Sequence, residues 1–247
     1  MASAALSQVT IHPVDLGLAE SARTAGPDDP PAVHVRARLD EQIRALLEHE
    51  PAARIGSDPE GVHQMRVAVR RIRAALKADG ANLGEAGAAL QSELRWLGGV
   101  LGAVRDLDVQ LEHLRGQAAD FPAAERDAVE RLLLGLRAGR QLARRDLLAA
   151  LRDSRYRALL AALAAAAVSE PPEQPAAGEP PAARLVAVIR RPYRKLHRAA
   201  EALDADPPDD DLHELRIHGK RLRYAAELAV EAGGPPVQAL IKATKRL

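Results

Sequence analysis

The chain carries one basic segment twice, and this duplication constrains its fold more than any other feature. Residues 62–77 read VHQMRVAVRRIRAALK, and residues 212–224 read LHELRIHGKRLRY. Both copies place a His at position i, an Arg at i+3 and basic residues at i+7, i+8 and i+10. On a helix, positions i, i+3, i+7 and i+10 fall within an arc of roughly 80°. We call each set a basic stripe; the members are His63, Arg66, Arg70, Arg71 and Arg73 in the first, and His213, Arg216, Lys220, Arg221 and Arg223 in the second.

The charge pattern of both stripes indicates an anion-binding site. Like charges spaced three or four residues apart on a helix repel each other, and residues 62–77 contain no acid. A single basic helix face is most often only solvated, but two copies in the same register favour a binding site. Four windows, 62–78, 184–200, 212–224 and 242–247, hold 18 of the 35 Lys and Arg residues and one acid, so they carry +17 and the remainder −16. This segregation predicts a defined site for a polyanion.

Composition predicts a helical protein. Ala and Leu dominate the 247 residues, aromatic residues are few, and the absence of Cys excludes disulfides and thiolate metal sites. The first 18 residues contain Gln8, His12 and Asp15 but no Lys or Arg, which fits neither a signal peptide nor a transit peptide. The longest apolar run, 158–168, is too short to span a bilayer. We therefore expect a cytoplasmic protein without a membrane partner.

The sequence divides into four regions. We expect an N-terminal tail at 1–32, a first helical half at 33–168, a mobile Pro-rich linker at 169–183 and a second helical half at 184–247. Apolar periodicity predicts helices at about 33–50, 60–78, 85–114, 123–168, 182–203, 212–232 and 236–247. The second helix should begin at Ser57-Asp58-Pro59-Glu60, which has capping residues and a proline suited to a first turn. The third should be interrupted or kinked near Gly98-Gly99 and Gly102.

Three segments together resemble the CHAD domain, a helical module named for its histidines. They are VHQMRVAVRRIRAAL, LRWLGGVLGAVRDLDVQLEHL at 94–114, and LHELRIHGKRLRYAAEL, in the family's order and spacing. Members of this family bind inorganic polyphosphate, and some are found at polyphosphate granules. The resemblance implies an all-α fold of two antiparallel helical bundles with an approximate internal twofold repeat, in which basic helices line a central channel.

The resemblance also implies the ligand residues. By motif position these are His63, Arg66, Arg70, Arg73, His213, Arg216, Lys220 and Arg223, with Arg71 and Arg221 beside them. Additional cations are expected from Arg190, Arg191, Arg194 and Lys195 on the neighbouring basic segment, and from Arg105 in the RDLD sequence. The family expects a counterpart of 94–114 after the second stripe, whereas this sequence stops there, so the second bundle is expected to be incomplete. Val237, Leu240 and Ile241 should then lack cover, which would suit a homodimer.

The chemistry predicted is binding without catalysis or a cofactor. No nucleophile stands beside a base, and no Gly-rich phosphate loop is present. A phosphoanhydride-processing enzyme, such as a polyphosphatase, is the alternative, although a carboxylate cluster for Mg²⁺ is missing. A nucleic-acid-binding protein is the third alternative. Single strands are disfavoured, because sequence-tolerant single-strand binders usually stack bases on aromatic rings, whereas double-stranded DNA could be bound through its phosphates alone. Here Tyr193 and Tyr224 have a spacing typical of core packing.

Three further charged patterns are interpreted structurally. HELRIH at 213–218 has its histidines five residues apart, whereas a zinc protease motif needs four, so no metal site is predicted. Asp106 and Asp108 diverge by about 200° on a helix, and they are expected to orient Arg105 or Arg95 through salt bridges. Arg137, Arg140 and Arg144 are expected on a mostly solvated face.

Overall fold

A computed structural model describes residues 10–78, 84–170 and 180–247, and its described residues form helices joined by short loops. This confirms the all-α prediction. The α-helices are α1 (Pro31–Ile55), α2 (Glu60–Ala78), α3 (Gly84–Gln117), α4 (Arg126–Arg152), α5 (Ser154–Val168), α6 (Pro181–Glu201), α7 (Asp209–Leu228) and α8 (Val230–Thr244). Three short 3-10 helices also occur, at Pro13–Leu16, Ala118–Asp120 and Ala123–Glu125. Of the predicted linker 169–183, residues 171–179 lie outside the described residues, and 181–183 belong to α6.

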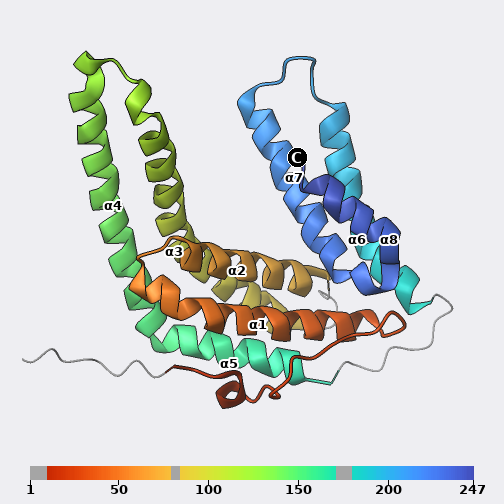
Figure 1. Cartoon of the computed structure of the whole chain (residues 1–247). Helices are drawn as coiled ribbons and strands as arrows, with labels where there is room; N and C mark the ends of the chain where they lie inside the picture. The colour runs from red at the N-terminus through yellow and green to blue at the C-terminus, as the bar shows by residue number, and fades with distance from the viewer. Residues whose placement is uncertain (1–9, 79–83, 171–179) are drawn as a thin grey trace, which may run out of the picture.

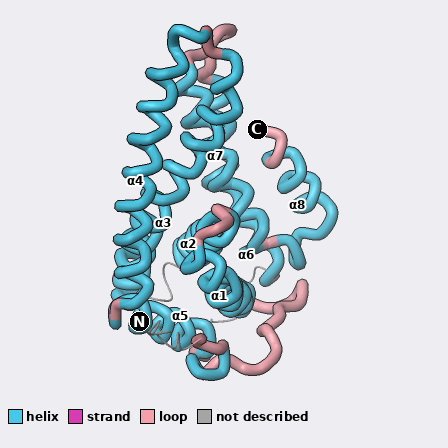
Figure 2. The backbone as a smooth tube through the Cα atoms, turned by 60° about the vertical axis from the view of Figure 1, so that its left-hand side comes forward, coloured by secondary structure: helices cyan, strands magenta, loops and turns pink. Residues whose placement is uncertain are grey.

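Helices α1, α2 and α5 lie side by side as a base, from which two helical hairpins rise on the same side (Figure 1). One hairpin is α3–α4, and the other is α6–α7 with α8 packed against it. Figure 2 shows that α2 runs along the base between the feet of these hairpins. It packs against α1, α3 and α7, so the first basic stripe lies where the two halves of the chain meet.

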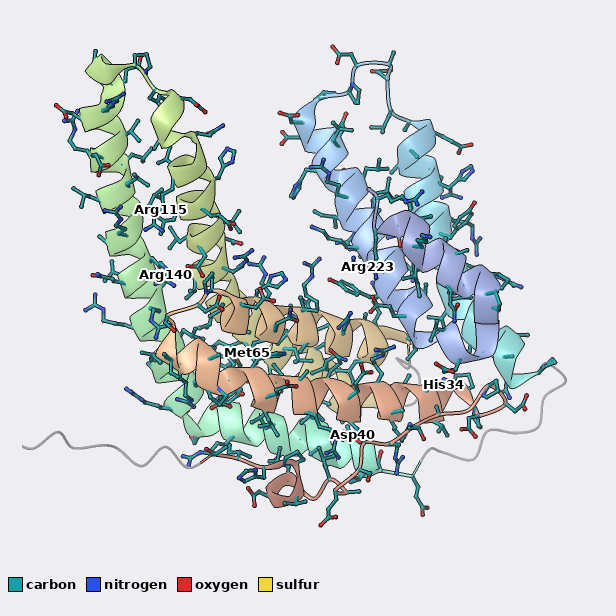
Figure 3. The ribbon with its side chains drawn as sticks, in the orientation of Figure 1. His34, Asp40, Met65, Arg115, Arg140 and Arg223 are labelled. Atoms are coloured by element: carbon teal, nitrogen blue, oxygen red, sulfur yellow. The ribbon has the colours of Figure 1, made fainter. Side chains whose placement is uncertain are left out.

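The apolar face of α2 forms the centre of the core. Its helical periodicity brings five residues to one side, each at most 2% exposed; they are Val62, Met65, Val69, Ile72 and Leu76. The α2 helix begins where predicted, with the Asp58 carboxylate accepting a hydrogen bond from the Glu60 backbone N–H at 2.8 Å. Met65 points down into the base in Figure 3. Burial of this face leaves the polar stripe turned away from the base.

Helix α3 is one helix from Gly84 to Gln117, so the interruption expected near Gly98-Gly99 and Gly102 does not occur. Gly98 and Gly102 lie on the side of α3 that packs against α2, and a Cβ at either position would meet α2 side chains at ordinary van der Waals distance. A Cβ on Gly98 would lie 3.5 Å from a methyl of Val69, and one on Gly102 would lie 3.4 Å from the Arg66 guanidinium. These two glycines therefore face α2 within a helix that continues past them.

The expected single helix over 123–168 is wrong, because the chain breaks at Asp153. This residue has an extended backbone (φ −66°, ψ 146°), and its carboxylate accepts a hydrogen bond from the Arg155 N–H at 2.8 Å. It thus caps the N-terminus of α5. The break allows α4 to stand in the hairpin while α5 packs against α1 in the base.

Helix α1 continues five residues beyond the predicted end at residue 50, even though Pro51 lies inside it. Its terminal carbonyls are bound by Arg144 of α4, which donates to the carbonyls of Ala53, Arg54 and Ile55 at 3.0, 2.6 and 2.9 Å. Cations suit a helix C-terminus. The prediction that Arg144 lies on a solvated face is therefore wrong, since it joins α4 to α1.

The end of the chain is better covered than expected. Helix α8 bends at Gly234, whose φ of 55° lies in the left-handed region that glycine tolerates. The bend turns the rest of α8 back along the α6–α7 hairpin (Figure 1). Val237 is buried there, and Leu240 and Ile241 are partly buried against the core. The expectation that these three residues lack cover is thus wrong.

Residues ahead of α1 pack along the base. Leu18 is buried, and Arg44 of α1 donates to the backbone carbonyls of Ala19, Glu20 and Ser21. Asp40 accepts a hydrogen bond from the Arg23 N–H. Among the described residues, no helix is both long enough and apolar enough to cross a membrane.

Candidate anion-binding site

The two basic stripes come together where α7 meets α2. The pKa of Lys220 on α7 is lowered, first by burial and then by the charges of Arg70, Arg223, Arg216 and Arg66. Two of these arginines belong to the α2 stripe and two to the α7 stripe. Lys220 therefore lies in a field that both helices supply, and burial together with this field disfavours its charged form.

A second cation, Arg73 of α2, also lies close to charges from other helices. The pKa of Arg73 is lowered, first by burial and then by Arg95, Arg70 and Arg221, which lie on α3, α2 and α7. Its Nε atom is buried without a hydrogen-bond partner among the described residues. A buried guanidinium nitrogen of this kind is costly unless it meets an acceptor. The region thus holds excess positive charge and an unsatisfied donor.

Glu227 of α7 bridges the two halves of the chain. Its carboxylate accepts hydrogen bonds from Nε and Nη2 of Arg71, at 2.9 and 3.5 Å, and lies 3.7 Å from Nε of Arg223. Its backbone carbonyl accepts a hydrogen bond from Arg38 of α1 at 2.7 Å. One residue therefore ties α1, α2 and α7 together, and Arg71 serves as a structural partner in this bridge.

Tyr224 supports two of the stripe arginines. The guanidinium of Arg70 lies over its ring at 5.3 Å from the centroid, and that of Arg223 lies at 5.2 Å. Figure 3 labels Arg223 on the part of α7 that approaches the base. The Tyr224 ring is buried, as predicted, so it orients guanidinium groups and offers no free face for stacking a base.

Arg66 lies flat against α3. Its Nη1 donates to the Asp106 carboxylate at 2.6 Å and to the Gly102 carbonyl at 3.3 Å. The other aspartate of the RDLD sequence, Asp108, is buried and accepts a hydrogen bond from Arg140 of α4. The two aspartates thus diverge as predicted and act as salt-bridge partners, but for Arg66 and Arg140 in place of Arg105 or Arg95. Arg140 is accordingly not on a solvated face.

The remaining stripe members differ in exposure. His63 is half-buried on α2, whereas His213, Arg216 and Arg221 are exposed on α7. Arg216 donates from Nε to the backbone carbonyl of Leu247 at 3.1 Å. Arg105 is half-buried on α3.

The cations of α6 lie on a separate face. Arg190, Arg191, Arg194 and Lys195 are all exposed. At about 100° per residue they occupy the side of α6 opposite the buried Leu185 and Ile189, which pack toward the rest of the second half. The arginines whose charges lower the pKa of Lys220 and Arg73 all lie on α2, α3 and α7. The structure therefore sets the α6 cations apart from the meeting point of the stripes.

Tyr193 belongs to this outer part of α6, so its predicted core role is wrong. It is 46% exposed, and its ring lies 5.8 Å from that of His197.

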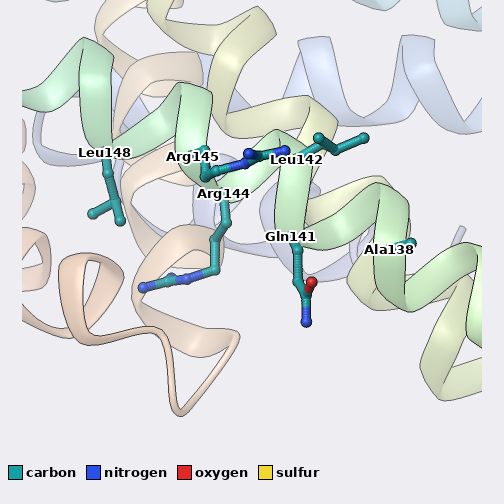
Figure 4. Close-up of a pocket in the computed structure, with 6 residues that line it drawn as sticks. All are labelled: Ala138, Gln141, Leu142, Arg144, Arg145 and Leu148. Atoms are coloured by element: carbon teal, nitrogen blue, oxygen red, sulfur yellow. The ribbon is translucent and has the colours of Figure 1, made fainter.

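Two surface hollows lie away from the stripes. One, of about 550 Å³, is lined by six residues of α4 (Figure 4). In this view Arg144 points away from Leu142, in keeping with its bonds to the end of α1. Another, of about 630 Å³, lies between α3 and α5 and is lined largely by alanines. Within the described ranges, no group of three or more His, Asp and Glu side chains is placed to hold a metal ion.

Sequence reasoning missed three contributors to the site, namely Glu227, Arg95 and Gly102. Glu227 could have been noticed as the first acid after the second stripe, four residues beyond Arg223. Its partner Arg71 lies 156 residues away along the chain, so helical spacing gave no indication of that bond. Arg95 and Gly102 act through the crossing of α2 and α3, which only the packed structure reveals.

Comparisons with known proteins agree with this architecture. A family model described as CHAD domain matches residues 37–247. Two uncharacterized proteins from two strains of Mycobacterium tuberculosis are each 37% identical over 204 residues, which cover 80% of this chain but only 39% of theirs. The chain therefore spans well under half the length of these relatives.

Two solved structures share the fold. The CHAD domain from the plant Ricinus communis superposes with a TM-score of 0.66 at 27% identity, covering 92% of this chain and 77% of that one. PptA from Streptomyces chartreusis superposes with a TM-score of 0.67 at 23% identity, covering 88% of this chain and 82% of that one.

Proposed function

Since the chain belongs to the CHAD domain family, we propose that it binds inorganic polyphosphate where the basic stripes of α2 and α7 meet. The observation that carries this proposal is that Arg70 of α2 and Arg223 of α7 lie over the same Tyr224 ring, at 5.3 and 5.2 Å from its centroid. Nearby, burial and then the arginines of both helices lower the pKa of Lys220. A bound polyanion would relieve this repulsion, so part of the free energy of binding is stored as unfavourable charge in the free protein.

The residue types suit this ligand. Polyphosphate presents closely spaced anionic oxygens along a flexible chain, and it has neither bases nor a fixed groove. The planar fork of Arg engages two oxygens at once, while Lys adds a compact charge. We assign direct contacts to the residues of both stripes other than Arg71, which holds Glu227; they are His63, Arg66, Arg70, Arg73, His213, Arg216, Lys220, Arg221 and Arg223.

The cations on α6 are proposed as an outer extension of the site. Because they lie apart from the stripes, a short phosphate oligomer held between α2 and α7 would not reach them. A long chain that leaves the stripes could continue over Arg190, Arg191, Arg194 and Lys195. Arg105 on α3 is a further contact for a long chain at the other side. Binding of long chains would also place the protein at polyphosphate granules.

Polyphosphate fits the stripes better than nucleic acid does. Single-stranded nucleic acid is held by aromatic platforms as well as charge. At the meeting point of the stripes the nearby ring, Tyr224, is buried beneath two arginines. Its faces are thus committed to guanidinium groups, which favours a ligand made of phosphate alone.

The test is a titration with long polyphosphate, tripolyphosphate and poly-A, each at the same phosphate concentration and at physiological salt. Long polyphosphate should bind most tightly, and its affinity should fall steeply as salt rises because many phosphate contacts release counterions. Poly-A binding as tightly as long polyphosphate would overturn the proposal. Arg152 is exposed on α4 outside both stripes. Reversing its charge is the control for charge reversals within the stripes, and it should change the affinity for polyphosphate little.

We further propose that binding occurs without turnover. The carboxylates at the stripes are bonded to arginines, as in the Arg66–Asp106 and Arg71–Glu227 pairs, and they would have to leave these partners to bind Mg²⁺. Incubation with polyphosphate and Mg²⁺ or Mn²⁺ should release no phosphate above background. Release that disappears in the Asp106→Asn variant would instead favour a phosphoanhydride-processing enzyme.

A further inference from the structure

Among the residues that the structure describes, two acidic side chains form ion pairs with the stripes, and their surroundings are opposite. Asp106 is 65% exposed and bonds to Arg66 alone among the stripe residues. Glu227 is 13% exposed and contacts Arg71 and Arg223, while its backbone binds Arg38. A water-exposed carboxylate with one partner can be exchanged, whereas a largely buried carboxylate with several partners holds its neighbours in place.

We propose that Asp106 is an exchangeable stand-in for phosphate, which occupies Arg66 in the free protein and is displaced when the ligand binds. The proposal rests on the proposed function, and it identifies a residue that sets affinity by competing with the ligand. Asp106 therefore acts against binding, although it lies among residues that favour it.

Arg66 is arranged to survive this exchange. Its Nη1 also donates to the Gly102 carbonyl at 3.3 Å, and its guanidinium lies against the glycine surface of α3. These backbone contacts do not involve Asp106, so they keep the guanidinium in place when the carboxylate leaves. Arg66 is then already oriented for an incoming phosphate, which reduces the entropic cost of ordering its side chain on binding.

Asp106 is suited to leaving. Exposed ion pairs contribute little because water solvates both partners well, and the departing carboxylate stays in water. A phosphate chain that reaches Arg66 also contacts other stripe cations, so it exchanges one carboxylate for several charge-assisted bonds. An isolated phosphate lacks these extra contacts and competes poorly. Asp106 thus biases the site toward chains over single phosphate ions.

The exchange has a distinctive dependence on salt. In the native protein Arg66 is already neutralised by Asp106, so a phosphate that takes its place releases few counterions from that residue. Without the carboxylate, Arg66 enters binding as one more free cation. The slope of log affinity against log salt concentration should then steepen by about one unit. A residue with a merely structural role would not change this slope.

The experiment compares wild type, Asp106→Asn and Asp146→Asn by titration with long polyphosphate over a range of salt. Asp146 is an exposed acid of α4, so its variant makes the same change in net charge away from Arg66. Asp106→Asn should raise the affinity about threefold to tenfold at low salt, since a nearby like charge is removed, and should steepen the slope. Asp146→Asn should do neither. The variant Asp106→Glu, which keeps the charge, should behave like wild type.

The outcomes separate the two proposals. If wild type and all variants fail to bind polyphosphate, the proposed function falls and this inference falls with it. If wild type binds but Asp106→Asn binds equally well or more weakly, with an unchanged slope, the exchange proposal alone is wrong. Equal gains from Asp106→Asn and Asp146→Asn would also overturn it, because net charge would then explain the effect.

Discussion

The two stripes share one sequence pattern, yet α2 and α7 carry it in different surroundings. At the position before the His, Val62 of α2 is buried whereas Leu212 of α7 is half-buried. Two residues after the His, Met65 is fully buried whereas Leu215 is half-buried. Helix α2 is covered by α1 and α3 along its apolar face, while the first turns of α7 lie away from the base, beside the last turns of α6 (Figure 1).

The cations follow the same division. Those of α2 are half-buried and several have partners, as in the pairs Arg66–Asp106 and Arg71–Glu227. Most of those on α7 are exposed. A repeated motif thus specifies the order of charges along each helix. The packing around each helix decides whether those charges are half-buried and paired, as on α2, or exposed to solvent, as on α7.

The largest expected effect concerns the core under each copy. Met65→Ala should lower the free energy of unfolding by about 2–5 kcal/mol, the usual cost of truncating a fully buried side chain. Leu215→Ala, at the equivalent position of α7, should cost only about 1 kcal/mol because Leu215 is partly solvated in the folded state. Urea denaturation followed by circular dichroism measures both values. Equal losses would show that the two copies are packed alike.

Charge reversal tests whether the two basic stripes form one binding site. Arg70→Glu and Lys220→Glu change the same motif position in α2 and α7, and each should weaken polyphosphate binding about tenfold to a hundredfold, as expected for lost charged hydrogen bonds. Because the charge of Arg70 contributes to the lowered pKa of Lys220, the two losses of binding free energy should be coupled in a double-mutant cycle measured by calorimetric titration. Additive losses would instead indicate two separate surfaces.

A smaller effect should separate the stripes from α6. The double variant Arg190→Glu/Arg194→Glu should weaken binding of long polyphosphate about threefold to tenfold, since each phosphate contact adds modestly to affinity. It should leave tripolyphosphate binding within about twofold of wild type, because a short chain is held by α2 and α7 alone. Equal losses for both ligands would place the α6 cations within the central site.

The smallest effect distinguishes Arg70 from its counterpart Lys220. A lowered pKa means that the charged form of Lys220 is disfavoured in the folded protein, so this group destabilises the fold below that pKa and ceases to do so as pH rises through it. Bound polyphosphate should raise this pKa again. Binding should therefore take up protons at pH values below the ordinary 10.5 of lysine, and affinity should decline as Lys220 deprotonates.

Titration calorimetry in buffers with different ionisation enthalpies measures this proton uptake. The Lys220→Arg variant, whose guanidinium stays charged throughout, should abolish most of it and should bind with less pH dependence. Uptake that persists in the variant would assign it to other groups and would remove Lys220 from the contact surface.

Much of the fold follows from the sequence because its signals are local. Apolar periodicity predicted a helix at 60–78, the range of α2, and composition predicted an all-α chain. The start of α2 near Asp58 was predicted from capping chemistry that spans only four residues. The break at Asp153 was missed, although an Asp followed by Ser is a helix-start signal, because apolar residues continue on both sides of it.

The sequence by itself determined the helices, the two stripes and the family to which the chain belongs. Only the tertiary structure decided which acid meets which arginine: Asp106 bonds to Arg66, Asp108 to Arg140 and Glu227 to Arg71. It also turned Arg144 toward the end of α1 and set the α6 cations apart from the stripes. The physical reason is range. Helix periodicity arises from neighbours within one or two turns, whereas a salt bridge between helices depends on where distant segments cross.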